Sequence, residues 1–173
     1  MKKVILICSL LTLVCSIAWA QSDKSKRPSP PDSVKVTTDD GVTIEIHYSK
    51  PSLKGREIGV DVAPINKIWR TGANEATTIQ VDKNVTVEGQ ELAAGKYSLH
   101  SIPGEEKTTI IFNKVWQKWG TQYDEKEDAV RVTVANATSS VAQEQFKIDI
   151  LPSGLVTLTW GSYAVPFTIK ATK

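Results

Sequence analysis

The feature that most constrains how this chain can fold is an alternation of apolar and polar residues with a period of two. From position 42 to position 49, Val, Ile, Ile and Tyr alternate with Thr, Glu, His and Ser. Successive side chains of a β-strand point to opposite faces, so this pattern predicts a strand with one buried face. Asp39-Asp40-Gly41 comes directly before it and predicts a hairpin turn in which Gly41 takes a positive φ. The partner strand is then expected at residues 34–36.

Further segments of the chain are short, rich in Val, Ile and Thr, and separated by glycine-containing turns. They cover residues 77–81, 85–87, 96–102, 108–113, 129–134, 145–151, 155–160 and 163–169. A long 3.6-residue period is absent, and the helix candidates are a turn within 124–128 and the stretch after Asn113. The sequence therefore predicts an all-β fold, an antiparallel β-sandwich of jelly-roll or immunoglobulin-like type with little helix. Pro166 predicts an edge position for the last strand.

The N-terminus has the three parts of a secretory signal peptide. Lys2 and Lys3 precede an apolar run over residues 4–19, and Ala18-Trp19-Ala20 forms an A-x-A cleavage site. A membrane anchor is the alternative, but it needs ~20 apolar residues, and this run is shorter and interrupted by serine and threonine. We expect cleavage after Ala20, a secreted or periplasmic (cell-envelope) location, and no transmembrane segment after cleavage.

The remaining chain is expected to form one domain. Residues 1–20 are the predicted signal peptide, residues 21–32 are rich in Ser, Pro and charge and predict a flexible linker, and residues 33–173 form a single β-sandwich domain. Cys8 and Cys15 both lie in the signal peptide, so no disulfide is expected in the mature chain. Without Lys2 and Lys3, the 21 basic residues become 19 and balance the 19 acidic ones. That balance excludes a basic field for nucleic acid.

Residues 69–77, Trp-Arg-Thr-Gly-Ala-Asn-Glu-Ala-Thr, form the most polar loop between predicted strands. The guanidinium of Arg70 can bind a carboxylate or a phosphate with two hydrogen bonds. Asn74 adds an amide, and Glu75 adds a carboxylate. Such a group of polar residues on a loop is typical of a binding or catalytic site. The alternative is a structural lock, in which Arg70 and Glu75 pair with each other or with the backbone.

Two histidines are the candidates for acid–base or metal chemistry. Alternation places His47 and His100 on one outward face of a sheet. Together with Glu75 they would supply three zinc ligands, but no H-E-x-x-H or H-x-H spacing supports a metal site, and we expect no metal and no cofactor. Catalysis with Glu75 as base and His100 as acid requires the two groups to lie within about 3 Å of each other or of a shared water.

Trp116 and Trp119 lie three residues apart in a stretch that lacks strand alternation. Exposed aromatic rings beside amides and carboxylates can stack on the faces of sugar rings. The alternative is that both tryptophans plug one end of the sandwich.

Several runs of residues resemble a family of exported bacterial proteins known only as a domain of unknown function. The resemblance extends from Val42 to Ile169 and is strongest in the Trp-Arg-Thr-Gly-Ala-Asn-Glu-Ala run from Trp69 to Ala76. Other matching runs are Pro51 to Arg56, Leu92 to Ile102, Ile110 to Lys114 and Tyr123 to Val134. It implies an exported, β-rich protein of the Gram-negative envelope, and it carries no activity. Arg70, Asn74 and Glu75 fit the family pattern, whereas an aromatic residue is commoner at position 100.

These observations favour a ligand- or glycan-binding module of the envelope over an enzyme. The expected binding residues are Arg70, Asn74, Glu75, Trp69, Tyr48, Arg56, His100 and Trp119. Arg70 would bind an anion, Asn74 would hydrogen-bond it, and Glu75 would orient Arg70. Expected partners are a small polar ligand, a glycan or an envelope protein. Two alternatives remain open, namely a hydrolase or lyase that uses Glu75 and His100, and a structural envelope protein without a small-molecule site.

Overall fold

The structure, a computed structural model, describes residues 23–172. The predicted signal peptide, with both cysteines, lies outside the described residues. Within them the chain forms ten β-strands and two 3₁₀ turns, η1 (Lys24–Lys26) and η2 (Glu125–Glu127). Neither described helix has the length or the apolar character needed to cross a bilayer.

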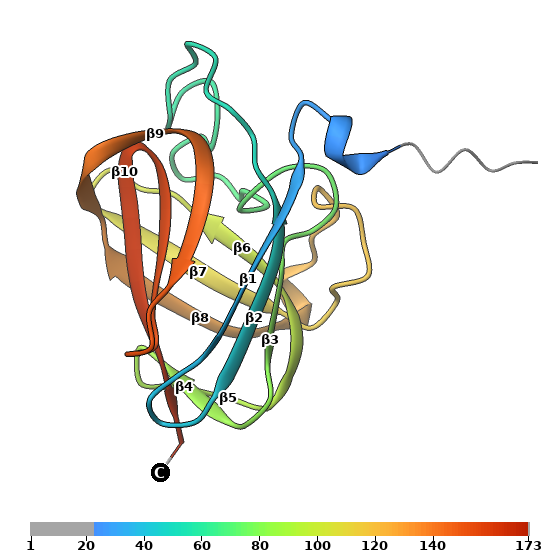
Figure 1. Ribbon diagram of the computed structural model, residues 1–173, viewed down its shortest axis with the longest axis vertical. Helices are drawn as coiled ribbons and strands as arrows, with labels where there is room; N and C mark the ends of the chain where they lie inside the picture. The colour runs from blue at the N-terminus through green and yellow to red at the C-terminus, as the bar shows by residue number, and fades with distance from the viewer. Residues whose placement is uncertain (1–22, 173) are drawn as a thin grey trace, which may run out of the picture.

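The strands form two antiparallel sheets (Figure 1). The larger sheet has the order β1-β2-β3-β6-β7-β8, with β1 at Pro31–Thr37, β2 at Thr43–Ser49, β3 at Thr78–Val81, β6 at Gly95–Ile102, β7 at Lys107–Asn113 and β8 at Asp128–Ala135. The smaller sheet has the order β5-β4-β10-β9, with β4 at Val85–Val87, β5 at Gln90–Leu92, β9 at Ala137–Ile150 and β10 at Leu155–Ala171.

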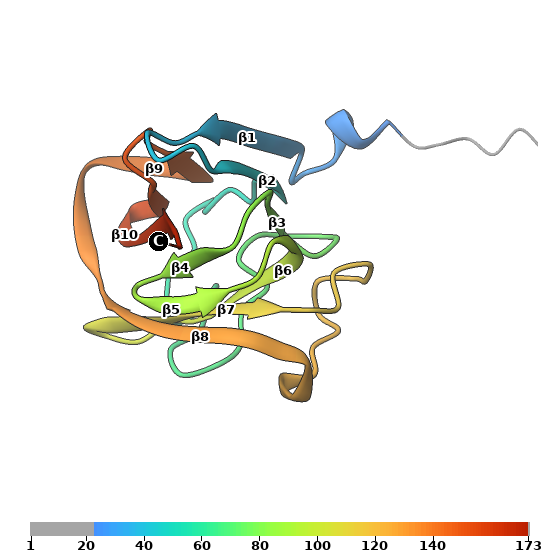
Figure 2. The ribbon, with the colours of Figure 1, turned by 90° about the horizontal axis from the view of Figure 1, so that it is seen from below.

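The two sheets enclose one apolar core. Alternate residues of β2, β6 and β7 point inward, among them Ile46, Leu99 and Phe112, and meet Phe146 and Phe167 of the smaller sheet. Viewed from below, the larger sheet curls so that β1 and β8 approach the two sides of the smaller sheet (Figure 2). Burial of these side chains supplies most of the driving force for folding, because none of the described residues is a cysteine.

The predicted all-β sandwich is confirmed. The predicted hairpin also forms, since β1 pairs with β2 across the turn that contains Gly41, whose φ is 80°. The six-plus-four division of strands differs from the four-plus-three arrangement of an immunoglobulin constant domain and from the eight strands of a jelly roll. The chain also passes from β8 of the larger sheet into β9 of the smaller sheet through Asn136 alone, so it changes sheet without a loop (Figure 2).

Two features of the last strands differ from the sequence predictions. Residues 155–160 and 163–169 belong to one strand, β10, whose register shifts on both sides of Gly161. The predicted edge position of Pro166 is wrong, because β10 lies between β4 and β9. Pro166 is tolerated there because it falls between the Ala164 pair with β9 and the Ile169 pair with β4.

The segment before β1 differs from a flexible linker over its described part. β1 already begins at Pro31, inside the range predicted as linker. Upstream, the side chains of Lys24 and Arg27 form ion pairs with Glu75, at 3.0 and 2.9 Å. Residues 23–30 therefore dock on the 69–77 loop, which local sequence composition does not reveal.

Candidate functional site

The 69–77 loop is an excursion of the chain from the larger sheet. Trp69 exchanges two backbone hydrogen bonds with Ser101 of β6, and the amide of Leu99 donates to the carbonyl of Thr77. Between these two anchors, on either side of His100, the loop makes no backbone hydrogen bond with β6. The anchors therefore fix both ends of the loop on either side of this histidine.

The middle of this loop holds an unusual backbone. Thr71, Gly72 and Asn74 have φ values of 50°, 150° and 60°, in a region that residues with a side chain seldom adopt. Thr71 is held there by a hydrogen bond from its hydroxyl to Ser101 Oγ, and its carbonyl accepts from Thr77 Oγ1 at 2.7 Å. A Cβ at Gly72 would lie 2.7 Å from Thr77 Oγ1. Much of the motif is thus explained by backbone conformation, as a structural lock requires.

A second loop, residues 114–124, covers the outer face of β6. It pairs with the first loop because the amide of Gly120 donates to the carbonyl of Asn74, and the amide of Ala76 donates to that of Lys118. A Cβ at Gly120 would lie 2.6 Å from Cδ of Arg70, so the Arg70 stem packs directly on the Gly120 backbone. Apart from the glycine at position 120, no local sequence pattern indicates this contact.

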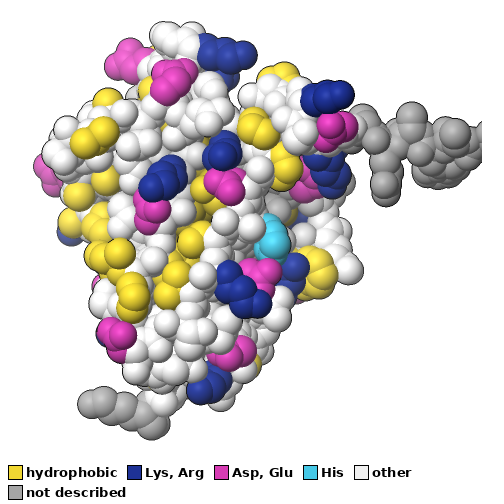
Figure 3. All heavy atoms as spheres, viewed as in Figure 1, with side chains coloured by type: hydrophobic (Ala, Val, Ile, Leu, Met, Phe, Trp, Pro, Cys, Tyr) yellow, Lys and Arg dark blue, Asp and Glu magenta, His cyan; other side chains and the backbone are white. Residues whose placement is uncertain are grey.

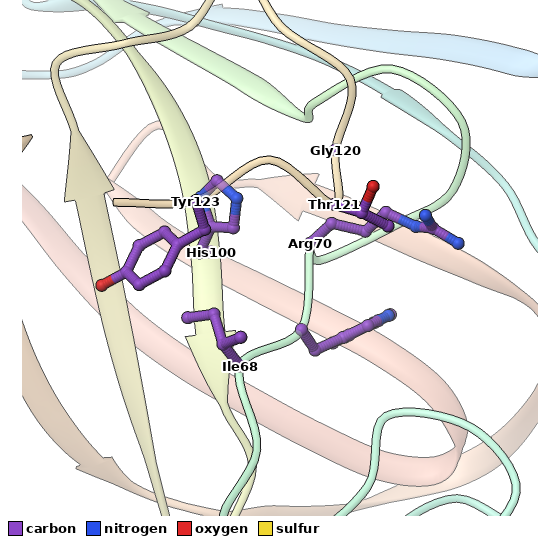
Figure 4. Close-up of a pocket in the computed structure, with 7 residues that line it drawn as sticks. Ile68, Arg70, His100, Gly120, Thr121 and Tyr123 are labelled. Atoms are coloured by element: carbon purple, nitrogen blue, oxygen red, sulfur yellow. The ribbon is translucent and has the colours of Figure 1, made fainter. Parts of the chain in front are cut away.

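The two loops and β6 line a half-open cavity of about 250 Å³ (Figure 4). Its lining residues are Ile68, Trp69, Arg70, His100, Gly120, Thr121 and Tyr123. The ring of His100 lies beside that of Tyr123, whereas the Arg70 side chain extends in the other direction, past Thr121 (Figure 4). Of the expected binding residues, the structure brings Trp69, Arg70 and His100 together here.

His100 is the most unusual group of the cavity. The prediction that it shares the outward sheet face with His47 is confirmed, but the loops leave only 1% of His100 exposed. Both of its ring nitrogens are sealed from solvent and make no hydrogen bond of good geometry among residues 23–172, although the Gly120 backbone approaches the ring as a weak acceptor. Burial, reinforced by the charge of Lys118, lowers the pKa of His100 to about 4, against a smaller opposing effect of the Gly120 backbone. The imidazole is therefore neutral at physiological pH.

The ring of Tyr123 packs on His100, and hydrogen bonds at its hydroxyl hold it in place. The two ring centroids lie 5.0 Å apart. The Tyr123 hydroxyl donates to Asp128 and accepts from Arg131, each at 2.7 Å. Burial, together with the hydrogen bond to Asp128, raises the pKa of Tyr123 to about 12. Tyr123 is thus a neutral, immobilised wall of the cavity.

Arg70 is half-buried and makes no hydrogen bond or ion pair with another side chain or backbone group among the described residues. It also lines a second cleft of about 310 Å³, where Trp69 and Arg56 lie as well. The guanidinium of Arg56, in contrast, donates to the carbonyls of Leu53 and Ser52. Arg70 is therefore a positioned cation with its donors free.

Asn74 and Glu75 lie on the other side of the loop and bind the N-terminal segment. The Asn74 amide donates to the carbonyl of Ser29 at 3.0 Å, and both carboxylate oxygens of Glu75 accept from Arg27. Partial burial raises the pKa of Glu75, but hydrogen bonds from its own backbone and from Lys24 and Arg27 outweigh that effect and lower it to about 2. The expectation that Glu75 pairs with Arg70 or orients it has no counterpart among the contacts observed.

Other expected residues also lie apart from the cavity. Tyr48 is buried, and its hydroxyl donates to Asp32 and accepts from the Ile148 amide, which ties the two sheets together. His47 is exposed and contacts Glu45 at 2.7 Å. Trp119 is 47% exposed, so the alternative in which both tryptophans plug the sandwich is wrong. Trp116 lies instead under Lys96, whose Nζ is 4.5 Å from the ring centroid.

Clusters of side chains able to hold a metal ion are absent from the described part of the chain. No group of three His, Cys, Asp or Glu side chains lies close enough to hold a metal ion within residues 23–172. Figure 3 shows basic and acidic side chains interspersed over one face of the molecule. Arg70 is therefore the lining residue with the clearest chemical capacity, since its guanidinium can bind an anion.

The fold and the cavity define a class, a single β-sandwich domain with a small cavity between two loops on the outer face of one sheet. The chain belongs to a family described as protein of unknown function (DUF2911), whose model matches residues 29–169. The resemblance to a domain of unknown function is thereby confirmed. Searches of curated proteins and of solved structures gave no match.

Proposed function

We propose that this protein is an exported binding module whose ligand is a small molecule carrying a carboxylate or another anionic group. The single observation that carries the proposal is that Arg70, which lines the cavity, has a guanidinium without a partner among residues 23–172. Its five donors are available, and a carboxylate or phosphate can accept from two of them at once.

The shape and chemistry of the site support binding of a small molecule. Ligand sites are concave and mostly apolar, with a few well-placed polar groups. Here Ile68, Trp69 and Tyr123 supply the apolar walls, whereas Arg70 and His100 supply the polar groups. Arg70 is positioned in advance by the Gly120 backbone, so little side-chain entropy is lost on binding.

The contacts of Glu75 argue against the hydrolase or lyase alternative. A general base must be free to accept a proton, but this carboxylate binds Lys24 and Arg27 and has a pKa of about 2. His100 contacts the ring of Tyr123 and not Glu75. The geometry supports binding and offers no acid–base pair at these two residues.

The proposal is tested by titration of the domain, residues 21–173, with small carboxylates, phosphate and neutral sugars in a calorimeter. We expect carboxylates to bind, and Arg70→Gln to weaken that binding at least tenfold. Lys67→Gln is the matched control, because it removes the same charge from an exposed neighbour outside the cavity. Equal affinities of wild type and Arg70→Gln would remove the basis of the proposal.

Export is part of the same proposal and has its own test. Its support is the signal-like N-terminus, with Lys2 and Lys3, an apolar run and an A-x-A site. We expect the full-length chain, expressed in a Gram-negative host, to appear in the periplasmic or extracellular fraction with Gln21 as its N-terminal residue by mass spectrometry. An intact N-terminus in the cytoplasmic fraction would contradict export.

A further inference from the structure

We infer that the ligand is a short chain of acidic sugars whose carboxylates bind Arg70 and Arg56 along the second cleft, which both residues line. This inference rests on the proposed function, because it keeps Arg70 as the anion-binding residue and adds a second one. A chain can reach two guanidinium groups that a single small anion cannot, since its carboxylates lie on successive sugars. Oligomers of galacturonate, in which every sugar carries one carboxylate, serve as probes.

The arginines of the structure fall into two pairs. Residues 23–172 contain four arginines, and two of them, Arg27 and Arg131, form ion pairs with acidic side chains. Arg56 and Arg70 form no ion pair within the same residues, yet both line the cleft of about 310 Å³. The side chain of Arg70 also extends away from His100 (Figure 4). Two cations without anionic partners along one cleft indicate a ligand with more than one anionic group.

Arg56 is held in place for this role by the backbone. Its Nε donates to the carbonyl of Leu53 at 3.0 Å, and its Nη2 donates to the carbonyl of Ser52 at 2.7 Å. Both partners are neutral, so the positive charge is not compensated, and Nη1 makes no hydrogen bond among residues 23–172. Because the guanidinium is already oriented, a carboxylate that binds it loses little free energy to side-chain ordering.

A third cleft, of about 430 Å³, adjoins the second, since Arg56 lines both. Its acidic lining residues are Glu57 and Glu105, whose carboxylates make no hydrogen bond or ion pair with another group among residues 23–172. Hydroxyl groups can donate to these carboxylates, whereas further anionic groups would be repelled by them. Sugars supply such hydroxyls, which favours an acidic sugar chain over an acidic peptide of equal charge.

Aromatic rings line both clefts. Trp69 lies in the second cleft and Tyr163 in the third. Trp69 is stacked on Trp160 with the ring centroids 5.6 Å apart, and the Tyr163 hydroxyl hydrogen-bonds to Thr108, so both rings are fixed. Rigid aromatic walls beside polar groups suit sugars, whose CH groups pack on the rings while their hydroxyls form hydrogen bonds.

The first experiment titrates the domain, residues 21–173, with galacturonate, digalacturonate and trigalacturonate in a calorimeter. We expect the dimer or the trimer to bind at least about tenfold more tightly than the monomer, as one additional hydrogen bond to a charged group allows. Arg70→Gln should weaken all three acids, whereas Arg56→Gln should weaken the oligomers and leave the monomer unchanged. Lys54→Gln is the matched control, because it removes the same charge from an exposed neighbour of Arg56 that lines neither cleft.

A second measurement does not depend on the fold of a variant. In the wild-type domain labelled with ¹⁵N-arginine, the Nε signals of Arg56 and Arg70 should both shift when the oligomer is added, and only that of Arg70 with the monomer. Arg27 and Arg131, which have ion pairs of their own, are the internal controls and should not shift.

The outcomes separate this inference from the proposed function. Equal affinity for the monomer and the oligomers, lost in Arg70→Gln, overturns the chain and leaves the anion site standing. An oligomer preference that survives in Arg56→Gln, an Arg56 signal that does not move, or equally tight binding of triglutamate, an acidic peptide, also overturns it. If the galacturonates do not bind at millimolar concentration but another carboxylate binds through Arg70, only this inference is wrong. If no acid binds, both proposals are wrong.

Discussion

The two ends of the 69–77 loop, only a few residues apart, are bound in opposite ways. At one end, the side chains of Asn74 and Glu75 bind the N-terminal segment, through Ser29 and Arg27. At the other end, Arg70 has no partner among the described residues and lines a cavity. The difference teaches that one polar motif can combine side chains that fix the structure with a cation that has no such role, so that a structural lock alone does not account for it.

The largest expected effect lies in the backbone between the two ends. Gly72→Ala should lower the free energy of unfolding by about 2–4 kcal/mol, because a Cβ at φ 150° would collide with Thr77 Oγ1 at 2.7 Å. Gly89→Ala is the control, since its φ of 83° is also positive but nothing lies within 4 Å of the added carbon. Urea denaturation measures both, and equal losses would mean that the close packing at Gly72 contributes nothing.

The next largest effect expected is a dependence of stability on pH that arises from the buried His100. The pKa of His100 falls from 6.5 in the unfolded chain to about 4 in the folded protein. The unfolded chain thus binds an extra proton between these values, and stability that is full above pH 6.5 is lost as the pH falls toward 4. For a fully buried ring the loss is about 2–3 kcal/mol.

Thermal unfolding at pH 7 and pH 4.5 measures this loss. His100→Gln should flatten the curve between the two values, whereas His47→Gln, at the exposed histidine, should not. A wild-type stability that stays constant from pH 6.5 to pH 4.5 would show that the His100 ring is not buried as described.

Removal of the free cation should have a small effect on stability. Arg70→Gln should change the free energy of unfolding by less than about 1 kcal/mol, because no hydrogen bond within residues 23–172 is lost. A structural lock at Arg70 would instead predict a sharp fall in melting temperature. The measurement is the melting temperature with and without a bound carboxylate. Wild type should gain stability from the ligand, and the variant should not.

The sequence predicted those parts of the fold that depend on neighbouring residues. The β1–β2 hairpin was visible because the alternation of Ile44 and Ile46 and the turn at Gly41 are local signals. β5 and the first half of β9 were missed. The residues of β9 from Ala137 to Gln143 are mostly exposed and lack alternation, so pairing with β10 makes them a strand.

The candidate site was predictable only in part, for a related reason. The 69–77 motif identified Trp69 and Arg70, and alternation placed His100 on the correct face. Burial of His100 depends on a loop that begins after β7, and the partner of Glu75 lies 48 residues earlier in the chain. A single sequence without geometry cannot distinguish an Arg70 that pairs with Glu75 from one that is free.

The smallest expected effect tests the occupied end of the loop. Glu75→Gln removes the ion pairs with Lys24 and Arg27, but the carboxylate is 42% exposed, so the loss of stability should stay below about 1 kcal/mol. Hydrogen exchange of residues 23–30 is the sensitive readout and should become faster in the variant, while carboxylate affinity stays unchanged.

Because the pKa of Glu75 is depressed to about 2, the faster exchange of residues 23–30 should appear in the wild type only as the pH falls from about 4.5 toward 2. Glu125→Gln, which also removes an exposed acidic group, should leave exchange in this segment unaltered. If Glu75→Gln abolished ligand binding instead, the two ends of the loop would act as one unit and the comparison would fail.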